Sequence, residues 1–440
     1  MLYYGAMDFP IFQLPFLGNR LLIAIVGIIH VLISHGCAIG GSILVVWLEH
    51  RFIKTGDSRL NDLAYRILRV LIILTTTLGA LTGVGIWFTT AIVSPYGIGS
   101  LLRIFFWAWA IEWVIFIIEL VLFLIYYLTW HKLEPHKHIK IGIAYIVFSY
   151  WTMIIIIGIL GAMLTPGRWL INHRFWDGYL NATFLPQLAS RTPMAVMLSC
   201  GFGLLISAFL RIDKDIRNYF HRLMGKWLIV STIVFVISAL FYYRALPAIP
   251  EIVKSIAFNT KSYEKYLAMS KLLIPVAGGL LCLAGFILFS FGSKIQRWTL
   301  LFPFLIMVVM VGQYERVREF VRKPYVIYNY MYSNGILVAE ESFLSKKGIL
   351  EVADWVKWQR TNEPSKEELG HRVFRIECST CHTYNGVNGV FRKTRGWDEK
   401  TITSFISGYK HTHPYMPPFV GTPEECKALA FFIYNSEKKK

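Results

Sequence analysis

The residues with the clearest chemical pattern lie near the C-terminus, where Cys378 and Cys381 are separated by two residues and His382 follows directly. Two thiols at this spacing add to the two vinyl groups of one porphyrin, and the adjoining imidazole supplies the proximal iron ligand. A zinc site is the alternative interpretation, but neither a second CxxC pair nor a paired-histidine motif accompanies this one. The motif therefore predicts one covalent haem c.

The sixth iron ligand is expected in the downstream sequence HPYMPPF, where Met416 offers a thioether. A methionine ligand raises the haem potential. His411 and His413 are the competing candidates, and ligation by either would lower the potential. With this loop and a closing helical stretch, the segment 366–440 resembles class I cytochrome c.

Five ionisable residues lie within long apolar runs: His30, His35, Glu112, Glu119 and Glu319. Ionisable groups at membrane depth are costly and are functional candidates by default. Glu112 and Glu119 are seven residues apart, so both project from one face of a helix. At about 1.5 Å per residue, His30 and Glu112 each lie roughly 15 Å below the outer surface, where they could meet around one macrocycle.

The apolar runs indicate the elements that position these residues. The chain is 55% hydrophobic and 16% charged, which excludes an ordinary soluble globular protein. Runs long enough to cross a hydrocarbon core of about 30 Å predict an all-α fold: a polytopic bundle of about eight transmembrane helices joined to a small α-helical cytochrome c domain. The predicted helices are 20–48, 62–93, 101–130, 139–164, 193–211, 223–244, 270–292 and 297–320.

Basic residues set the predicted orientation. The formal charge is +18, and Lys and Arg concentrate in the loops after the first, third, fifth and seventh helices, as in cytoplasmic loops rather than in a nucleic-acid-binding surface. The N-terminus and everything after about residue 321 are then periplasmic, which is where haem is attached to CxxCH motifs. We expect a multi-pass protein of the bacterial inner membrane, without a cleavable signal peptide and without a nucleic-acid partner.

Composition divides the chain into a transmembrane haem-binding bundle at 1–323, a periplasmic connector at 324–365 and the cytochrome c domain at 366–440. The connector is aromatic and polar, and it includes an amphipathic stretch around Trp355 and Trp358. This stretch predicts a strap on the membrane surface, in contact with lipid.

Several motifs of the bundle resemble subunit I of the cytochrome bd quinol oxidases. NRLLIAIVGIIH resembles the first helix of that family, which implies that His30 is an axial haem ligand. IEWVIFIIELVLFLIYYLTW resembles its third helix, which implies that Glu119 is a proton-path carboxylate and that Glu112 lies close to a second acid, although the family spacing is eight and this one is seven. EFVRKPY resembles a glutamate followed by Arg-x-Pro-aromatic, which implies that Glu319 ligates a haem. For Glu119, a helix-packing hydrogen bond is the alternative.

The departures from the family concern quinol. Its low-spin haem b uses a His on the fifth helix and a Met on the seventh, but the fifth helix here has no His. Met194, Met197 and Met269 lie near the relevant helix ends, although buried Met is more often core filler than ligand. The long quinol-binding loop is shortened to about 245–269, and the cytochrome c domain replaces the family's ninth helix. We therefore do not expect direct quinol oxidation by the family's route.

Arg316, Arg318 and Arg322 cluster beside Glu319, where guanidinium groups would pair with haem propionates. An ordinary basic cluster at the membrane edge is the alternative. The expected cofactors are one covalent haem c and one or two non-covalent bundle haems, of type b or type d. No ligand role is expected for five histidines at the cytoplasmic helix ends, whose polar tips would reach the interface: His50, His131, His136, His138 and His221.

These features leave three functions open. The first is a bd-like terminal oxidase, or an oxidoreductase derived from one, that takes electrons from a periplasmic cytochrome through haem c. The second is an electron-transfer module of a larger respiratory complex, with six-coordinate haems alone, and the third is a structural anchor whose bundle holds no haem. A second membrane subunit is a further expected partner.

Overall fold

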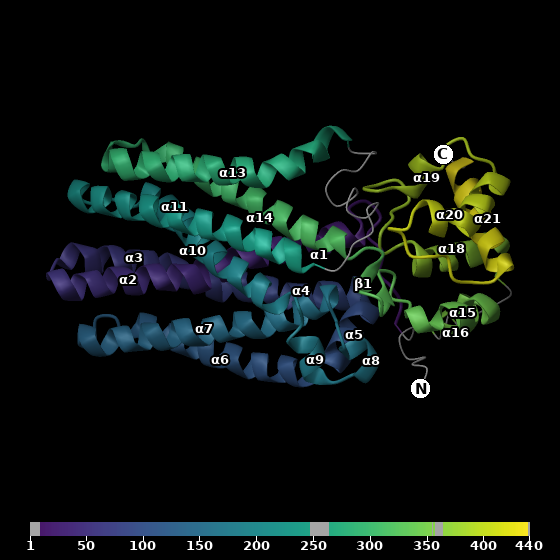
Figure 1. Ribbon diagram of the computed structural model, residues 1–440, viewed down its shortest axis with the longest axis horizontal. Helices are drawn as coiled ribbons and strands as arrows, with labels where there is room; N and C mark the ends of the chain where they lie inside the picture. The colour runs from purple at the N-terminus through teal and green to yellow at the C-terminus, as the bar shows by residue number, and fades with distance from the viewer. Residues whose placement is uncertain (1–8, 247–263, 354, 357–363, 439–440) are drawn as a thin grey trace.

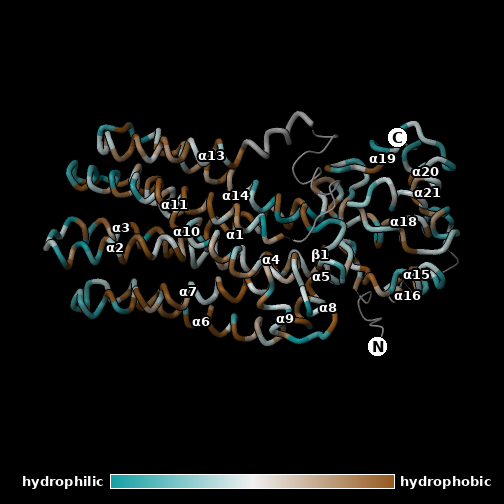
Figure 2. The backbone as a smooth tube through the Cα atoms, viewed as in Figure 1, coloured by the Kyte–Doolittle hydropathy of each residue, from teal (hydrophilic) through white to brown (hydrophobic). Residues whose placement is uncertain are grey.

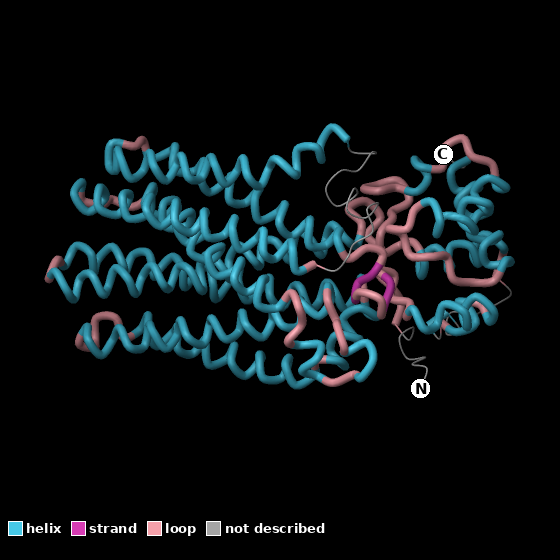
Figure 3. The backbone as a smooth tube through the Cα atoms, in the orientation of Figure 1, coloured by secondary structure: helices cyan, strands magenta, loops and turns pink. Residues whose placement is uncertain are grey.

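The structure is a computed structural model that describes residues 9–246, 264–353, 355–356 and 364–438, and of 264–272 and His411 the backbone only. Helices make up nearly all of the regular structure in these residues, and a two-stranded hairpin is the one sheet among them (Figures 1 and 3). The predicted all-α fold is confirmed.

Eight helical spans in the described part of the chain are long and apolar enough to cross a membrane, as predicted. They lie along one direction as a bundle, and the C-terminal helices form a separate group at one end (Figure 1). We call this the domain end and the opposite one the far end, where polar turns cap the apolar spans (Figure 2). The spans are Asn19–Thr55, Ser58–Val93, Phe106–Leu128, Pro135–Leu164, Phe184–Phe209, Lys214–Ala245, Leu273–Lys294 and Arg297–Val321.

The spans are built from both single and joined helices, and short helices α5, α8 and α9 connect them at the domain end. The elements are α1 (Asn19–Ile33), η2 (Ser34–Ile39), α2 (Gly40–Thr55), α3 (Ser58–Ile73), η3 (Leu74–Gly79), α4 (Ala80–Val93), α5 (Pro95–Ile104), α6 (Phe106–Leu128), α7 (Pro135–Leu164), α8 (Trp169–Asn172), α9 (Phe175–Tyr179), α10 (Phe184–Phe209), α11 (Lys214–Ala245), α13 (Glu264–Phe291), η5 (Gly292–Lys294), η6 (Arg297–Leu300) and α14 (Leu301–Val321).

Local sequence signals start several of these helices at the far end. Asp57 and Asp213 cap α3 and α11, because each carboxylate accepts a hydrogen bond from a backbone N–H of the first turn. Pro135 begins α7, where its fixed φ suits a first helical residue and its missing N–H costs nothing. The turns of the bundle are therefore specified by short polar motifs between apolar runs.

Two π-helical segments, η2 and η3, interrupt the first two spans and pack on each other. A π-helical turn is rare and is most often found at a functional site. His35 lies within η2, and His30 lies one turn before it on α1. The apolar pattern carries no signal for these segments, because a π-helical turn changes the backbone hydrogen-bond ladder without changing the apolar composition of the span.

Beyond α14 the chain forms a connector and then a small helical domain. The connector holds the hairpin β1 (Tyr325–Ile327) and β2 (Met331–Tyr332), followed by η7 (Val338–Glu340), α15 (Glu341–Lys347) and α16 (Ile349–Val352). The domain holds α18 (Lys366–Glu377), α19 (Val390–Lys393), α20 (Glu399–Thr412) and α21 (Pro423–Lys438). Its core is the crossing of α18 and α21, where the two backbones approach closely at Gly370.

The C-terminal domain is seated on the bundle by the segment before α1. Ile11 is buried in the same apolar cluster as the core of the domain. Its carbonyl accepts a hydrogen bond from Arg375 at 2.9 Å, and the carbonyl of Phe16 accepts one from the backbone N–H of Val387 at 2.8 Å. A Cβ on Gly386 would lie 2.1 Å from the same carbonyl oxygen, so only glycine permits this approach.

The predicted membrane-surface strap is wrong for Trp355. The residue Trp355 is 1% exposed. The guanidinium of Arg375 lies 4.8 Å from a ring centroid of Trp355, and the indole N–H of Trp355 donates a hydrogen bond to the hydroxyl of Tyr96. The amphipathic pattern therefore reflects packing between the connector and the domain end of the bundle. Trp358 lies outside the described residues.

We expect Gly370→Ala to destabilise the C-terminal domain. A Cβ at this position would lie 2.0 Å from the carbonyl oxygen of Ala428, and overpacking of this kind costs about 1–3 kcal/mol. The measurement is thermal unfolding of the purified protein, followed by the absorption of the covalent haem. Gly408→Ala on α20 is the matched control, since open space surrounds it and alanine favours a helix by about 1 kcal/mol. Equal melting temperatures for the two variants would refute the packing argument.

Candidate functional site

The CxxCH motif begins where α18 ends. The N–H of Cys378 closes the last turn of α18, and the chain then folds into a tight turn in which the N–H of His382 donates to the carbonyl of Cys378 at 2.8 Å. Cys378 and Cys381 are both free thiols. The turn thus presents two unpaired thiols and one imidazole within five residues, which is the donor set that a covalent haem requires.

His382 is oriented for iron by its own loop. Its Nδ1 lies 3.0 Å from the carbonyl oxygen of Asn388, so Nδ1 carries the hydrogen and Nε2 is the nitrogen available to a metal. Burial lowers the pKa of His382 to about 4, so the imidazole is neutral at physiological pH, as a ligand must be. Asn388 takes a positive φ of 56° and also bonds the carbonyl of Cys381, which fixes the whole loop. The residues present fit haem c.

The loop that holds Met416 is a tight turn. The N–H of Met416 donates to the carbonyl of His413 at 2.9 Å, and the Met416 side chain is half-buried. The ring of His413 packs on Phe405 and Tyr415, and its Nδ1 lies 2.9 Å from the hydroxyl of Thr412. These contacts engage the ring and Nδ1 of His413 but not its Nε2, so His413 stays a competing candidate, and the side chain of His411 lies outside the described residues. Met416 as the sixth ligand stays a prediction.

Glu377, which sequence reasoning did not single out, is buried beside the first haem thiol. Its carboxylate accepts hydrogen bonds from the backbone N–H of Val420 at 3.0 Å and from Asn334 at 2.8 Å. It therefore ties α18 both to the segment after Met416 and to the connector. Burial raises the pKa of Glu377 to about 8, and the two hydrogen bonds offset only part of that effect. A glutamate directly before CxxCH carries no sequence signal of such a contact.

Arg20, at the start of α1, joins the haem c motif to the bundle. One of its guanidinium nitrogens lies 3.9 Å from the sulfur of Cys381, and the other lies 3.2 Å from a carboxylate oxygen of Glu319. The residue predicted to ligate a bundle haem is thus one side chain away from a residue predicted to bond haem c. The first helix and the last transmembrane helix meet at the point where the domain rests.

Glu319 lies at the centre of an ion cluster. Its carboxylate also pairs with Arg322 and lies 3.3 Å from the ammonium group of Lys323. Arg322 and Lys323 are buried, and burial together with the nearby charge of Arg20 lowers the pKa of Lys323 to about 8. Glu319 as an iron ligand stays a prediction.

A second ion cluster lies one turn earlier on α14. Glu315 binds Arg191 of α10 at 2.5 Å and Arg318 at 2.8 Å, and Arg191 also lies 3.4 Å from Nε2 of His35. Arg191 is 2% exposed. The sequence did not reveal this cluster, because the predicted fifth helix began at residue 193 and left Arg191 in the preceding loop, whereas α10 begins at Phe184.

The two clusters together carry excess positive charge. Five cations, Arg20, Arg191, Arg318, Arg322 and Lys323, face two carboxylates. In the described part of the chain, Nε of Arg191, Nη1 of Arg318, Nε of Arg322 and the amide of Gln187 are buried without hydrogen-bond partners. Uncompensated buried charge is strongly unfavourable, so further anions are expected here. Haem propionates fit these donors. Arg316, the third predicted propionate partner, lies over the ring of Phe320 at 4.9 Å, and its pairing with a propionate stays a prediction.

His30 faces the second span. Its Nδ1 lies 3.3 Å from the carbonyl oxygen of Gly79 and 3.2 Å from the hydroxyl of Thr82, so Nε2 is the nitrogen available to iron. A Cβ on Gly83 would lie 3.2 Å from the imidazole ring, so a small residue makes room for it. From Arg20 to His30 the helix rises about 15 Å, so His30 and Glu319 cannot bind the same iron. The bundle therefore has candidate ligands for two separate haems.

Glu119 is buried between α6 and α7. Its carboxylate accepts hydrogen bonds from Tyr145 at 3.4 Å and from Thr152 at 3.2 Å. Glu112 is half-buried two turns earlier on the same helix. Helix α1 packs on α4 and α14, whereas α6 packs mainly on α7, so a shared macrocycle between His30 and Glu112 stays a prediction.

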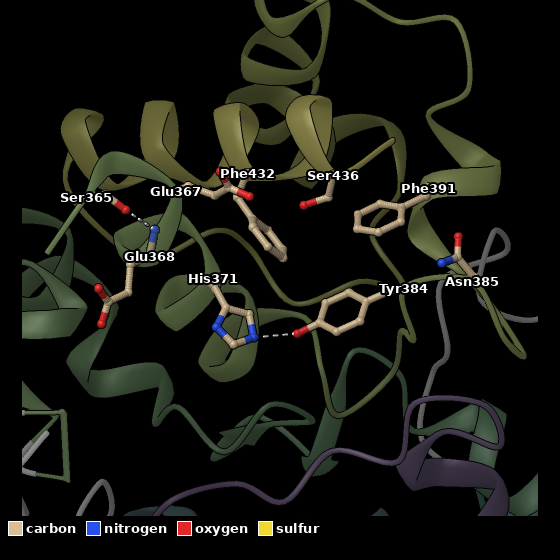
Figure 4. Close-up of a pocket in the computed structure, with 9 residues that line it drawn as sticks. All are labelled: Ser365, Glu367, Glu368, His371, Tyr384, Asn385, Phe391, Phe432 and Ser436. Atoms are coloured by element: carbon tan, nitrogen blue, oxygen red, sulfur yellow. Dashed lines mark hydrogen bonds between the residues drawn. The ribbon is translucent and has the colours of Figure 1, made fainter. Parts of the chain in front are cut away.

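A shallow open pocket marks one surface of the C-terminal domain. Figure 4 shows His371 and Tyr384 facing each other across it, with Nε2 of His371 2.7 Å from the Tyr384 hydroxyl. Phe391 and Phe432 form its apolar wall. This hydrogen bond engages Nε2 of His371 and the Tyr384 hydroxyl with each other.

Two family models match the chain. Residues 19–245, just over half of it, match cytochrome bd terminal oxidase subunit I, and residues 366–433 match cytochrome c oxidase, cbb3-type, subunit III. The solved bd oxidase from Geobacillus thermodenitrificans is similar over 70% of this chain and 87% of that chain, with a TM-score of 0.60 and 15% identity, which shows the fold alone. No curated protein matches the sequence.

Glu377 predicts an unusual pH dependence. Its pKa is about 8 in the fold against an ordinary value of 4.5, so the folded domain holds an extra proton between these values. The contribution of this group to stability is therefore complete below about pH 4.5, declines as the pH rises, and is lost above about pH 8. Glu377→Gln, which cannot ionise, should remove this decline.

The measurement is urea unfolding of the C-terminal domain in the full-length protein at several pH values, read by haem absorption. Glu424→Gln is the control, because it removes an exposed carboxylate from α21 and should leave the pH profile as it is. The same downward trend in Glu377→Gln as in the natural chain would assign the effect to another group.

Proposed function

Because the chain belongs to the cytochrome bd terminal oxidase subunit I family and carries a cytochrome c domain, we propose that this respiratory electron-transfer haem protein is a terminal oxidase that takes its electrons through haem c. The observation that carries the proposal is that Arg20 lies within 3.9 Å of Cys381 and 3.2 Å of Glu319, which brings the haem c motif next to the bundle. A periplasmic cytochrome would be the electron donor, and quinol would not be oxidised directly. The protein would lie in the bacterial inner membrane with both termini in the periplasm.

The ion clusters support two non-covalent haems, of type b or d, in the bundle. A haem with an open coordination position would supply the redox chemistry of oxygen reduction. His30 would hold one haem and Glu319 the other, while Arg318 and Arg322 would bind propionates through their free nitrogens. Glu119 would hold a proton near this site. The surrounding apolar spans exclude bulk water.

A second candidate is an electron-transfer module without oxygen chemistry. The cations around Glu319 favour it, because a carboxylate held by three cations is a weaker iron ligand. In that case every haem would be six-coordinate. A second membrane subunit would be a partner in either function.

The proposal is tested with purified protein that retains its native haems. Reduced by ascorbate and a small redox mediator, the protein should consume oxygen, and carbon monoxide should change the spectrum of a bundle haem. Oxygen uptake should be lost in the double variant Cys378→Ala/Cys381→Ala when a reduced soluble cytochrome is the only donor. Neither oxygen consumption nor carbon monoxide binding in the natural protein would exclude the oxidase and leave the electron-transfer module.

We expect His30→Ala to lose one non-covalent haem while it keeps haem c. The imidazole is the only group that this change removes, and the haem c motif is formed by residues 378–382. A pyridine haemochrome spectrum counts c-type and other haems in one sample. His50→Ala, also in the first span, is the control and should keep the full complement. Unchanged non-covalent haem in His30→Ala would contradict its role as a ligand.

A further inference from the structure

Glu49, Tyr126 and His138 form a buried hydrogen-bonded cluster at the far end of the bundle, on α2, α6 and α7. Nδ1 of His138 lies 2.6 Å from one oxygen of Glu49, and the hydroxyl of Tyr126 donates to the other at 2.6 Å. Glu49 and His138 are each 2% exposed. The prediction that the polar tip of His138 reaches the interface is therefore wrong, because this carboxylate draws the ring inward.

The hydrogen bonds of the cluster require one extra proton. Nε2 of His138 lies 2.8 Å from the backbone carbonyl of Tyr126, which can only accept, so Nε2 carries a hydrogen. The bond between Nδ1 and Glu49 then needs a second hydrogen, carried either by the imidazole or by the carboxyl group. Without it, a lone pair would face a carboxylate oxygen at 2.6 Å. The cluster therefore holds one proton shared between His138 and Glu49.

Aromatic rings cover the cluster. Tyr126 stacks on His138 with ring centroids 4.6 Å apart, and Trp130 packs edge-on at 4.8 Å from the same imidazole. Two other titratable rings, Tyr65 on α3 and exposed His131 after α6, pack 4.6 Å from each other, and Tyr65 also packs on Trp130. Trp130 belongs to the turn at 129–134, so its ring lies between the shared proton and the exposed residues of that turn.

The cluster is the first tier of a polar seam between α6 and α7. On α6, Tyr126, Glu119 and Glu112 follow one another at intervals of seven, and on antiparallel α7 the residues His138, Tyr145 and Thr152 do the same. His138 meets Tyr126, and Tyr145 and Thr152 both meet Glu119. Residues seven apart lie on one helix face, separated by about 10.5 Å. Polar side chains thus recur from the far end to Glu112.

We propose that Glu49, His138 and Tyr126 form a proton-loading site that takes protons from the aqueous phase at the far end and passes them along the α6–α7 seam to Glu119. The inference rests on the proposed function in that oxygen reduction consumes the protons: one oxygen molecule, four electrons and four protons give two water molecules. On each transfer, the His138–Glu49 pair loses its shared proton and regains one from solvent. The proposal requires water molecules to carry the proton between the first tier and Tyr145, a rise of about 10.5 Å along α7.

The experiment uses the full-length protein with its native haems in liposomes. A reduced soluble cytochrome c outside the vesicles reaches only molecules whose haem c domain faces outward, and a trapped pH dye reports proton uptake at their far ends. In the natural protein the interior should become alkaline during oxygen consumption. Glu49→Gln and His138→Gln should slow this uptake at least tenfold while the reduction rate of haem c stays unchanged.

Two further variants keep the test decisive. Tyr126→Phe retains the ring packing and removes only the hydroxyl, so it should fold as the natural chain does and slow uptake by a smaller factor. His136→Gln is the matched control, because this exposed histidine lies two residues from His138 and outside the cluster. Haem content and the reduced spectrum are recorded for every variant, so that loss of structure is recognised.

The outcomes separate this inference from the proposed function. Inside uptake as fast in Glu49→Gln and Tyr126→Phe as in the natural chain would overturn the proton-loading site, and so would oxygen consumption without internal alkalinisation. If the natural protein consumes no oxygen, the proposed function fails. Proton uptake from the vesicle interior is then measured during anaerobic reduction of the bundle haems. Slower uptake in Glu49→Gln than in the natural chain and in the His136→Gln control would still support the site.

Discussion

The guanidinium of Arg20 contacts both Cys381 and Glu319, and the arrangement of the molecule around the haem c motif depends on these contacts. Arg20 reaches both because the segment before α1 folds back against the C-terminal domain through Ile11 and Phe16. The connector also packs against the bundle, where Trp355 is buried and donates a hydrogen bond to Tyr96. Residues more than 300 positions apart in sequence thereby form one site.

Charge in an apolar bundle must be paired or neutralised, and this constraint organises α14. Glu315 pairs with Arg318 of the same helix and with Arg191 of α10. Glu319, one turn later, pairs with Arg20 of α1 and with Arg322 and Lys323 just after α14. The carboxylates are too few for these cations, which accounts for the unpartnered nitrogens of Arg191 and Arg318. The same constraint operates at the far end, where Glu49 and His138 share one proton in a hydrogen bond and together carry no net charge.

The sequence was sufficient for the features that depend on composition and short spacing. The eight spans follow from apolar length, and the orientation of His382 toward a metal agrees with its place directly after two thiols. Two features escaped prediction because their cause is tertiary. The π-helical segments leave no trace in the apolar pattern, and the burial of His138 depends on Glu49, which lies 89 residues earlier on another helix.

Motif resemblance identified Glu119 and Glu319, but it did not give their surroundings. Tyr145 and Thr152 reach Glu119 because α6 and α7 run antiparallel, and a linear motif does not contain that packing. For Trp355, the sequence pattern predicted the wrong surroundings, a membrane surface in place of protein. An amphipathic pattern on a connector has the same appearance whether its apolar face meets lipid or protein, and only the fold decides between them.

The seating of the C-terminal domain on the segment 9–18 has a kinetic consequence. Many electron carriers on a tether must diffuse between a position that loads an electron and a position that delivers it, so their turnover depends on tether length and solvent viscosity. A domain held by hydrogen bonds to the carbonyls of Ile11 and Phe16 has no such search to perform. Under the proposed function, only the external donor diffuses, and each electron it leaves arrives at a fixed distance from the bundle.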